Sequence, residues 1–329
     1  MILADGSRIA RHATSTPSEL GPDAVVRACI ETLAAARTDA PLEIRAALAG
    51  IGVSSPGPIN PWTGVIVSPP NLGPDFHDIP FATELEAALG LPVYLDRDTN
   101  VAALGEQAFG AARNVDDFLY LTVSTGFGGA IVIAGQLLHG PDGMAGELGH
   151  VSVELDGPLC GCGGTGHLEA ISSGVALARD ARAAVADGSS PFLAACAAQS
   201  PEGPAALDAR DVAEGEAAGD PVCAGLMAHA RHAFAMACAG FVNAFNPELI
   251  VVGGSIAEHQ GDRLLGPARD EIRRGSFATP GGRVRVVPAE LGPDVSLAGS
   301  QPLVSGRLQD DRWRRGRAHL GVIQSSGRP

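Results

Sequence analysis

Lysine is absent from this 329-residue chain, and all 23 of its basic residues are arginine. Neither a GxxxxGK[ST] phosphate loop nor a Schiff-base lysine can therefore exist in it. Any nucleotide would have to be bound through backbone amides, arginine and metal. The 37 acidic residues give a net charge of −14, which argues against a general nucleic-acid binder, because such proteins bind phosphates through basic patches.

Long apolar runs are also scarce. The N-terminus has no apolar stretch of the kind found in secretory signal peptides. The most apolar long segment, residues 222–245, contains His229, Arg231 and His232, which favours a buried helix over a membrane span. We therefore predict a cytoplasmic protein with neither a nucleic-acid nor a membrane partner.

The composition is that of an ordinary globular protein, with 45% hydrophobic and 18% charged residues. The length fits two domains or one large one. Four of the six cysteines, Cys29, Cys196, Cys223 and Cys238, fall in alanine-rich helical stretches and are interpreted as small core residues. The other two cysteines belong to a different pattern, described below.

Strand and helix patterns alternate along the chain, which favours an α/β architecture. Asp5-Gly6 is a hairpin turn signal, and only residues 1–4 precede it, so the chain is expected to begin partway through a hairpin. The expected strands are 8–14, 44–53, 92–95, 118–123, 130–134, 249–252 and 283–287. The expected helices include 81–89, 101–109, 168–187, 221–246, 263–274 and 295–299, and a basic, mostly disordered tail is expected from residue 301.

A candidate metal site lies in the glycine-rich stretch GELGHVSVELDGPLCGCGGTGHLE. His150, Cys160, Cys162 and His167 supply four borderline or soft ligands within eighteen residues, as a closed tetrahedral zinc site requires. The alternative is a pair of buried cysteines beside two surface histidines, although free cysteines favour helices and strands over a glycine loop. Four protein ligands leave no position for water, so the zinc is expected to be structural.

Two glutamates lie at the ends of this stretch. Glu147 precedes His150 by three residues, and Glu169 follows His167 by two. Solvated loop charges are the alternative, but an acidic pair beside a metal loop is costly without a partner. We expect the carboxylates to receive polyol hydroxyls, and His150 to offer the ring N–H that does not face the metal to a ligand.

Two glycine-rich turns follow apolar strands. The first, STGFGG, contains Thr125, Gly126, Gly128 and Gly129, whose amides and hydroxyls could bind phosphate oxygens. The second contains Gly253 and Gly254, which could let a flat or anionic ligand approach the backbone. The alternative for both turns is that the glycines are there only because a tight turn between strands has no room for a side chain.

Asp98 stands where an expected strand ends and a helix begins, a position at which ligands gather in open α/β sheets. Taken alone, helix capping by Asp98, Thr99 or Asn100 explains the pattern better. A carboxylate there could instead take a proton from a substrate hydroxyl.

Together these motifs resemble the ROK family of bacterial sugar kinases, related open reading frames and sugar-responsive repressors. AGELGH, CGCGGTGHLE and LEAISSG carry the specific part, and PGPIN, PPNL, LDRDTNVAALGE, STGFGG and VVGGS follow the family's order. The resemblance implies a two-domain actin-like, ribonuclease-H-like α/β fold with a cleft between the domains and a zinc-stabilised loop. The expected domains are residues 1–107 and 108–300, followed by the tail 301–329. It also implies phosphorylation of a hexose, most often glucose, by ATP and Mg²⁺.

The family's functional residues carry over by position. The resemblance implies that Asp98 is the base for the sugar 6-hydroxyl and that Asn71, Glu147, His150 and Glu169 bind other hydroxyls. The turn from Thr125 to Gly129 would face the ATP phosphates, and Gly253-Gly254 the adenosine. A homo-oligomer, dimer or tetramer, is implied as well.

Three departures leave alternatives open. His167 replaces the family's third cysteine, and Arg97 replaces the usual asparagine before the catalytic aspartate. The strand and DxGxT loop that open family kinases are not found before the first turn. A catalytically impaired sugar binder is therefore an alternative, as is a kinase for fructose, mannose or an N-acetylhexosamine, and polyphosphate is an alternative donor. A repressor is disfavoured because no helix-turn-helix segment precedes the kinase-like part.

Overall fold

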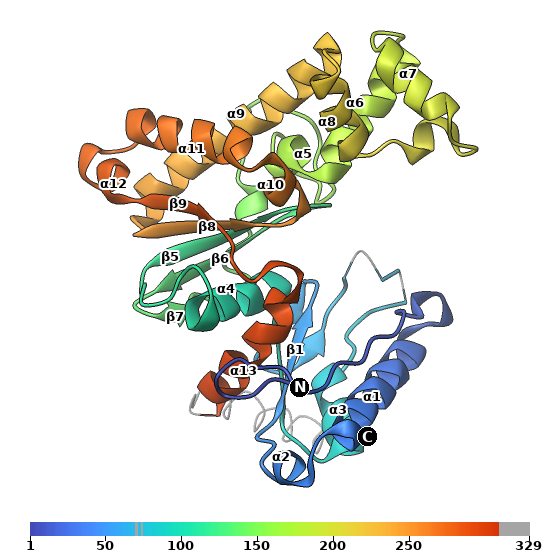
Figure 1. The fold of residues 1–329 in the computed structure, drawn as a ribbon, viewed down its shortest axis with the longest axis vertical. Helices are drawn as coiled ribbons and strands as arrows, with labels where there is room; N and C mark the ends of the chain where they lie inside the picture. Colours follow the sequence, from blue (N-terminus) through green and yellow to red (C-terminus); the bar gives the residue numbers. More distant parts are fainter. Residues whose placement is uncertain (70–71, 74, 309–329) are drawn as a thin grey trace, which may run out of the picture. The chain divides into compact units, whose positions relative to one another are not determined.

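The computed structural model describes residues 1–69, 72–73 and 75–308, which form two compact units (Figure 1). Unit 1 comprises Met1–Asn114, Leu137–Ala145 and the described part of Glu290–Pro329. Unit 2 comprises Val115–Gln136 and Gly146–Ala289. These boundaries differ from the expected division at residues 107 and 300, because unit 1 receives two segments from later in the chain.

Unit 1 is built on a two-stranded parallel sheet of β1 (Ile51–Ser55) and β4 (Val93–Arg97), with Ile51 opposite Val93 and Ser55 opposite Arg97. Helices α1 (Pro22–Asp39) and α3 (Phe81–Leu89) pack on it through a core that includes Val26, Leu85 and Leu95. A small antiparallel pair, β2 (Ile59–Asn60) and β3 (Val65–Ile66), adjoins this core.

Two further helices of unit 1, α4 (Asp98–Phe109) and α13 (Val295–Arg307), cross at close range. A Cβ added to Gly299 would lie 1.8 Å from the carbonyl oxygen of Val101, so only glycine fits this crossing. Glu106, which is fully buried, accepts the backbone N–H groups of Glu290 and Leu291, each at 3.0 Å. These contacts place the segment from residue 290 onward in unit 1.

The expected tail from residue 301 is wrong for its first part, because α13 continues through Arg307. Pro302 inside the helix, together with Gly299 and Gly306, obscured the helical pattern in the sequence. Residues 309–329 lie outside the described part of the chain.

Unit 2 holds a five-stranded sheet in the order β7-β6-β5-β8-β9. Its strands are β5 (Phe118–Val123), β6 (Phe127–Ile133), β7 (Gln136–Leu137), β8 (Leu249–Gly253) and β9 (Arg285–Pro288). β5 is antiparallel to β6 and parallel to β8, and β8 is parallel to β9. The carboxyl ends of β5 and β8 therefore lie side by side.

Helices α9 (Pro221–Phe245) and α11 (Asp262–Gly275) pack together and share a hydrophobic core with this sheet (Figure 1). Phe234, Ile250 and Val252 lie in that core. A second core, around Leu177, Leu193 and Met227, joins the start of α9 to three helices: α6 (Gly174–Ala186), α7 (Pro191–Ala198) and α8 (Ala209–Ala217). Within the described residues, the remaining helices are α2 (Leu42–Ala46), α5 (Glu169–Ser172), α10 (Ser255–Gln260) and α12 (Ala278–Arg283). Short 3-10 turns lie at Ser18–Leu20, Leu148–His150, Gly203–Ala206 and Gly292–Asp294.

Several expected elements were nearly right. The helix over residues 81–89 and the strand over 118–123 are confirmed, and the expected 221–246 helix ends at Phe245. The expected helix 168–187 is broken at Ser173, whose side chain caps α6 by accepting the N–H of Ala176.

Two expected strands were wrong. The expected strand 44–53 begins inside the helix α2 and becomes β1 only at Ile51, because a short apolar run does not distinguish helix from strand. The expected strand 8–14 reduces to a single bridge between Ile2 and Arg8, although the hairpin turn at Gly6 does form, with φ +82°.

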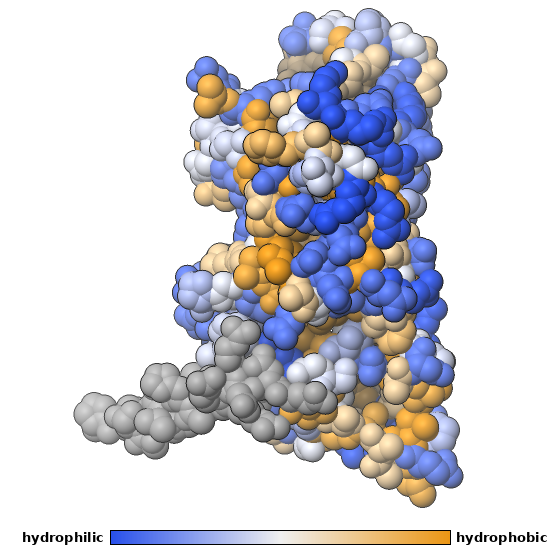
Figure 2. Space-filling view, turned by 90° about the vertical axis from the view of Figure 1, so that its left-hand side faces the viewer, coloured by the Kyte–Doolittle hydropathy of each residue, from blue (hydrophilic) through white to orange (hydrophobic). Residues whose placement is uncertain are grey.

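Hydrophilic and hydrophobic residues are interspersed over the face seen in Figure 2. Among the described residues, no helix combines the length and the apolar character that crossing a membrane requires.

Candidate functional site

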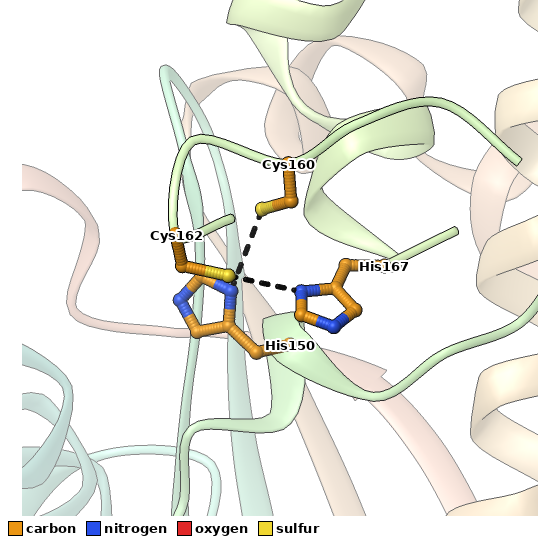
Figure 3. Close-up of side chains that lie close together, drawn as sticks. All are labelled: His150, Cys160, Cys162 and His167. Atoms are coloured by element: carbon orange, nitrogen blue, oxygen red, sulfur yellow. Dashed lines mark hydrogen bonds between the residues drawn. The ribbon is translucent and has the colours of Figure 1, made fainter. Parts of the chain in front are cut away.

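Four side chains converge in unit 2 as a candidate metal centre (Figure 3). One donor atom from each of His150, Cys160, Cys162 and His167 lies within 4.8 Å of all the others. Cys160 Sγ is 3.6 Å from His150 Nδ1, and Cys162 Sγ is 3.2 Å from His167 Nδ1. Ligand atoms around a tetrahedral zinc ion are separated by about 3.5 Å, given bond lengths of about 2.0 to 2.3 Å. The four predicted residues are thus brought together, and the two separations of 3.6 and 3.2 Å are close to that value.

The backbone of the loop brings these ligands together. Cys160 N–H donates to Gly164 O at 2.8 Å, and Gly163 N–H donates back to Cys160 O at 2.9 Å, which forms a tight turn around the CxC pair. Gly166 has φ +67°, and a Cβ there would meet the carbonyl oxygen of Glu154 at 1.7 Å. Glycine is therefore required where the chain folds back toward His167.

Both flanking glutamates lie beside this cluster. Glu147 Oε2 is 3.9 Å from His150 Nε2, so this ring has Nδ1 toward the cysteines and Nε2 toward the carboxylate. Glu169 Oε2 accepts the N–H of Phe127 at 3.0 Å, and its Oε1 accepts from Cys160 Sγ at 3.7 Å. Glu169 thereby connects the cluster to the first residue of β6.

The turn between β5 and β6 is shorter than expected. It comprises only Ser124, Thr125 and Gly126, because β6 already begins at Phe127. Gly128 and Gly129 lie in this strand, which corrects their expected place in the turn. A Cβ on Gly129 would lie 2.8 Å from Leu148 Cδ1, so close packing accounts for this glycine.

The turn and the second glycine site are adjacent in space. Ser124 Oγ and Ser255 Oγ are 3.0 Å apart, because each follows one of two neighbouring parallel strands. Gly254 has φ +95°, and a Cβ there would meet Val123 O at 2.5 Å, whereas a Cβ on Gly253 would meet the Tyr120 hydroxyl at 2.7 Å. Thr125, at the tip of the turn, is exposed.

The first amides of α6 bind the same turn. Gly174 N–H donates to Ser124 O at 2.8 Å, and Val175 N–H donates to Thr125 O at 3.0 Å. The turn, the start of α6 and the start of α10 thus form one polar group at the carboxyl ends of β5 and β8.

Asp98 is in unit 1 and is the first residue of α4. The expected helix began only at residue 101, three residues later. It is exposed, although its neighbours Arg97 and Thr99 are buried, and its Oδ1 accepts the N–H of Thr99 at 2.7 Å. Arg97 donates to the carbonyl oxygen of Ala145. Asn71, predicted as a sugar ligand, lies outside the described residues.

The sequence reading missed a group of buried polar residues close to Asp98. Asp96 is fully buried, and His139 and Arg307 are 7% and 6% exposed. Burial alone would raise the pKa of Asp96, but the hydrogen bond and charge of His139, the charge of Arg307 and the hydrogen bond of Asn100 hold it well below its ordinary value. In the sequence, Asp96 belongs to a run of polar residues that follows the expected strand 92–95, although the structure places it within β4. Arg307 carried no signal in the sequence.

A separate cavity of about 1000 Å³ lies within unit 1. Its lining is contributed mainly by the N-terminal residues, α1, β1, α3 and α13. None of the predicted site residues that the structure describes lines it.

The described geometry is thus that of an α/β protein with a Cys/His cluster and a polar turn at the carboxyl ends of two strands. The family model described as "ROK family" matches residues 1–307, and the chain belongs to the ROK family.

Similar proteins are known by sequence and by structure. The chain is 33% identical over 310 residues to a glucokinase of Thermotoga maritima, covering 94% of this chain and 93% of the relative. The ROK hexokinase of Thermus thermophilus superposes with a TM-score of 0.75 at 33% identity, covering 92% of both chains. A ROK family glucokinase from Streptomyces griseus, solved in complex with glucose and AMPPNP, superposes with a TM-score of 0.74 at 28% identity, covering 93% of this chain and 94% of that one.

Proposed function

We propose that this protein is an ATP-dependent hexose kinase that transfers the γ-phosphoryl group to the 6-hydroxyl of glucose. The observation that carries the proposal is the arrangement around Glu169. One carboxylate oxygen contacts Cys160 of the metal cluster and the other accepts from Phe127, beside the turn assigned here to ATP phosphates. The similarity to a glucokinase over 94% of the chain supports the same reaction.

The sugar side of the proposal rests on Glu147, His150 and Glu169. Carboxylates accept hydrogen bonds from hydroxyl groups, and a histidine that faces a metal through Nδ1 has Nε2 left for a further contact. A zinc ion bound by the loop would keep these groups in a fixed arrangement, so a sugar would bind without the entropic cost of ordering them. Asn71 is proposed as a fourth sugar ligand.

The catalytic base in this proposal is Asp98. A carboxylate at the start of a helix is favoured in its ionised form by the helix dipole, and the exposed position leaves it accessible to a substrate. Asp98 would accept the proton of the 6-hydroxyl as its oxygen attacks the γ-phosphorus, and ADP would leave in line.

The phosphate side consists of backbone and hydroxyl groups, in agreement with the absence of lysine. Thr125 and Gly126 in the turn, with Gly128 beside it, would contact the ATP phosphates, and Gly253 and Gly254 the adenosine side. Gly129 contributes packing on Leu148 in this assignment. Mg²⁺ would accompany the ATP and neutralise charge on its β- and γ-phosphoryl oxygens.

We assign zinc to the cluster of His150, Cys160, Cys162 and His167. The two thiols and two imidazoles suit zinc, and their donor atoms converge. Elemental analysis of the purified protein should find one zinc per chain, and the double variant Cys160→Ser, Cys162→Ser should contain none. A metal-free wild type that is fully folded would contradict the assignment.

The kinase activity itself is tested with purified protein, Mg²⁺-ATP and a panel of hexoses, following ADP release. Glucose is the expected substrate, with fructose, mannose and N-acetylhexosamines as the comparison and polyphosphate as a second donor. If no sugar releases ADP while glucose still raises the melting temperature, the protein is a sugar binder and the enzyme proposal is wrong.

A second form of the protein sharpens this test. If the gene encodes a DxGxT segment upstream of Met1, the extended chain should be assayed beside the present one.

We also propose that the protein forms a homo-oligomer, either a dimer or a tetramer. Light scattering on the purified protein measures its mass in solution directly.

A further inference from the structure

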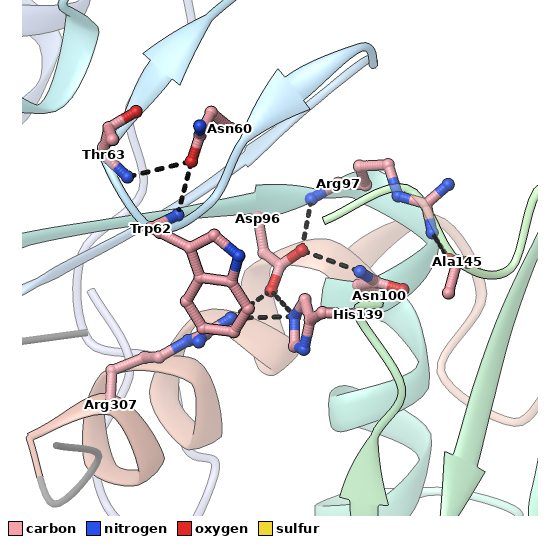
Figure 4. A network of polar contacts seen from close by, with 9 residues as sticks. All are labelled: Asn60, Trp62, Thr63, Asp96, Arg97, Asn100, His139, Ala145 and Arg307. Carbon is pink, nitrogen blue, oxygen red and sulfur yellow. Dashed lines mark hydrogen bonds and ion pairs between the residues drawn. The ribbon is translucent and has the colours of Figure 1, made fainter. Parts of the chain in front are cut away.

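A buried polar network lies beneath the start of α4 (Figure 4). Its centre is Asp96, whose side chain is fully buried and contacted by four groups. Oδ2 is 2.7 Å from both Arg307 Nη2 and His139 Nε2. Oδ1 accepts the N–H of Arg97 at 2.8 Å and the side-chain amide of Asn100 at 2.7 Å.

The network is drawn from distant parts of the sequence. Asp96 is on β4, His139 is in the segment after β7, and Arg307 ends α13, 211 residues after Asp96. Arg307 Nη2 also lies 2.8 Å from His139 Nε2, and its guanidinium sits 5.0 Å from the ring centroid of Trp62. The arginine is thus held by an ion pair and by an aromatic face.

The contacts of Oδ1 span the residue assigned as the base. Arg97 precedes Asp98 and Asn100 follows it by two, so one carboxylate oxygen binds the chain on both sides of Asp98. The Asp98 side chain in turn accepts the N–H of Thr99. A displacement of Asp96 would therefore move the first turn of α4, which carries Asp98.

The network is a costly way to fill a core. Buried ion pairs often stabilise a protein no more than apolar residues of equal volume would, so stability alone does not explain this one. The four contacts to Asp96 nevertheless fix one geometry for its carboxylate, because each hydrogen bond has a defined direction. Within the described residues, the buried Oδ1 of Asn100 has no hydrogen-bond partner. Pre-organised groups around a base are what phosphoryl transfer requires, since most of its catalysis comes from positioning.

We propose that Arg307 and His139 are positioning residues that orient Asp98 through Asp96. The proposal rests on the proposed function, in which Asp98 is the base. The end of the C-terminal helix is then part of the catalytic apparatus without touching the substrate.

The test compares Arg307→Met, Arg307→Lys and His139→Gln with wild type, with Arg113→Met as the control. Arg113 is an arginine of the same unit that forms an exposed ion pair with Glu290.

Removing Arg307 should lower kcat for glucose phosphorylation about 10- to 100-fold. This is the loss expected when a catalytic group, here Asp98, is misplaced by a fraction of an ångström to 1 Å. The KM for ATP should change by less than about threefold, because the network does not include the residues assigned to ATP. Arg307→Lys should recover part of kcat, since it restores the charge, and Arg113→Met should behave as wild type.

A purely structural role would lower the melting temperature but leave kcat unchanged in samples that circular dichroism shows to be folded. That result would overturn the proposal. If Arg307→Met does not fold, the test rests on Arg307→Lys and His139→Gln, because both variants keep a hydrogen-bond donor for Asp96. A fall in kcat of at least threefold in these variants supports the proposal. A wild-type kcat in both contradicts it.

Two further measurements separate this proposal from the function on which it rests. If Asp98→Asn is inactive while folded Arg307→Met keeps wild-type kcat, only the positioning role fails. An activity-independent test follows the Thr99 amide by NMR, since Asp98 Oδ1 accepts its hydrogen bond. Its resonance should move in Arg307→Met and stay in place in Arg113→Met, and an unmoved Thr99 resonance would contradict the positioning role even if the wild type phosphorylated no sugar.

Discussion

At the scale of single residues, the neighbourhood of Asp98 differs from that of an ordinary helix start. An exposed carboxylate stands between buried residues, and a second carboxylate two positions earlier is fully buried. The sequence run LDRDTN identified Asp98 as a candidate base but gave no means of separating the roles of the two aspartates. Only the burial and the partners of Asp96 make that separation.

We predict that Asp98→Asn lowers kcat by about 10²- to 10⁴-fold, the usual contribution of a general base. Asparagine keeps the shape of the side chain and its hydrogen bond to Thr99, so the melting temperature should change little. Steady-state kinetics with glucose and ATP measure the effect. A variant with wild-type kcat would remove Asp98 from the mechanism.

A second prediction concerns acid stability. The pKa of Asp96 in the folded protein is below its ordinary value of 3.8, so its stabilising contribution is fully present above that value and is lost as the pH falls toward the folded pKa. Below pH 4 the free energy of unfolding of wild type should fall more steeply than that of Asp96→Asn, by up to about 1.4 kcal/mol per pH unit. Urea unfolding of both proteins between pH 2.5 and 5 gives the two slopes. Parallel curves would mean that Asp96 titrates alike in the folded and unfolded chains.

At the scale of elements, the crossing of α4 and α13 is set by glycine. A Cβ on Gly105 would lie 2.7 Å from Val295 O, and a Cβ on Gly299 would lie 1.8 Å from Val101 O. The helices can approach this closely only because both positions lack a side chain. This crossing brings Arg307 to the network around Asp96.

We predict that Gly299→Ala lowers the free energy of unfolding by about 2 kcal/mol or more, because the added methyl group overpacks the helix crossing. Gly306→Ala on the same helix is the matched control, since nothing lies within 4 Å of a Cβ there. Alanine is the better helix former, so the control should raise the free energy of unfolding by about 0.5 to 1 kcal/mol. Chemical denaturation of the two variants measures both signs. Equal effects would show that the crossing is not the cause.

At the scale of the whole molecule, the residues of unit 2 that are assigned to the metal, the sugar and the ATP phosphates are in contact with one another. The cluster of His150, Cys160, Cys162 and His167, then Glu169 and the turn at Thr125, form one connected series within unit 2. Loss of the metal is therefore expected to disturb sugar binding first. Gly253, which ends β8, and Gly254, which follows it, are assigned to adenosine and do not belong to the loop.

We predict that glucose at 100 times its Kd stabilises the zinc-loaded protein by about 2.7 kcal/mol, as mass action requires for a ligand of the native state. After treatment with a chelator most of this glucose effect should disappear, while stabilisation by an ATP analogue should persist. Thermal unfolding with each ligand, before and after chelation and again after zinc is restored, measures both. Retention of the glucose effect in zinc-free protein would separate the loop from sugar binding.

Much of the site was readable in the sequence because its parts are local. The CxC pair, the glycines around it and the two histidines lie within one short loop, where spacing and turn geometry decide what can meet. The strand over residues 118–123 and the helix over 81–89 were likewise predictable from short-range apolar periodicity. Proximity along the chain is what made these inferences possible.

The tertiary structure alone decided the rest, because the interactions join residues that are far apart along the chain. Ser124 meets Ser255 because β5 and β8 are parallel neighbours, and Arg307 meets Asp96 because α13 packs on α4. The sequence predicted only the first part of α13, residues 295–299, because Pro302 and two glycines obscure the helical pattern. Packing against α4 stabilises the helix through Arg307. The sequence by itself thus determined the chemistry of the candidate metal loop, and the packing of distant segments determined which buried charges surround the residue assigned as the base.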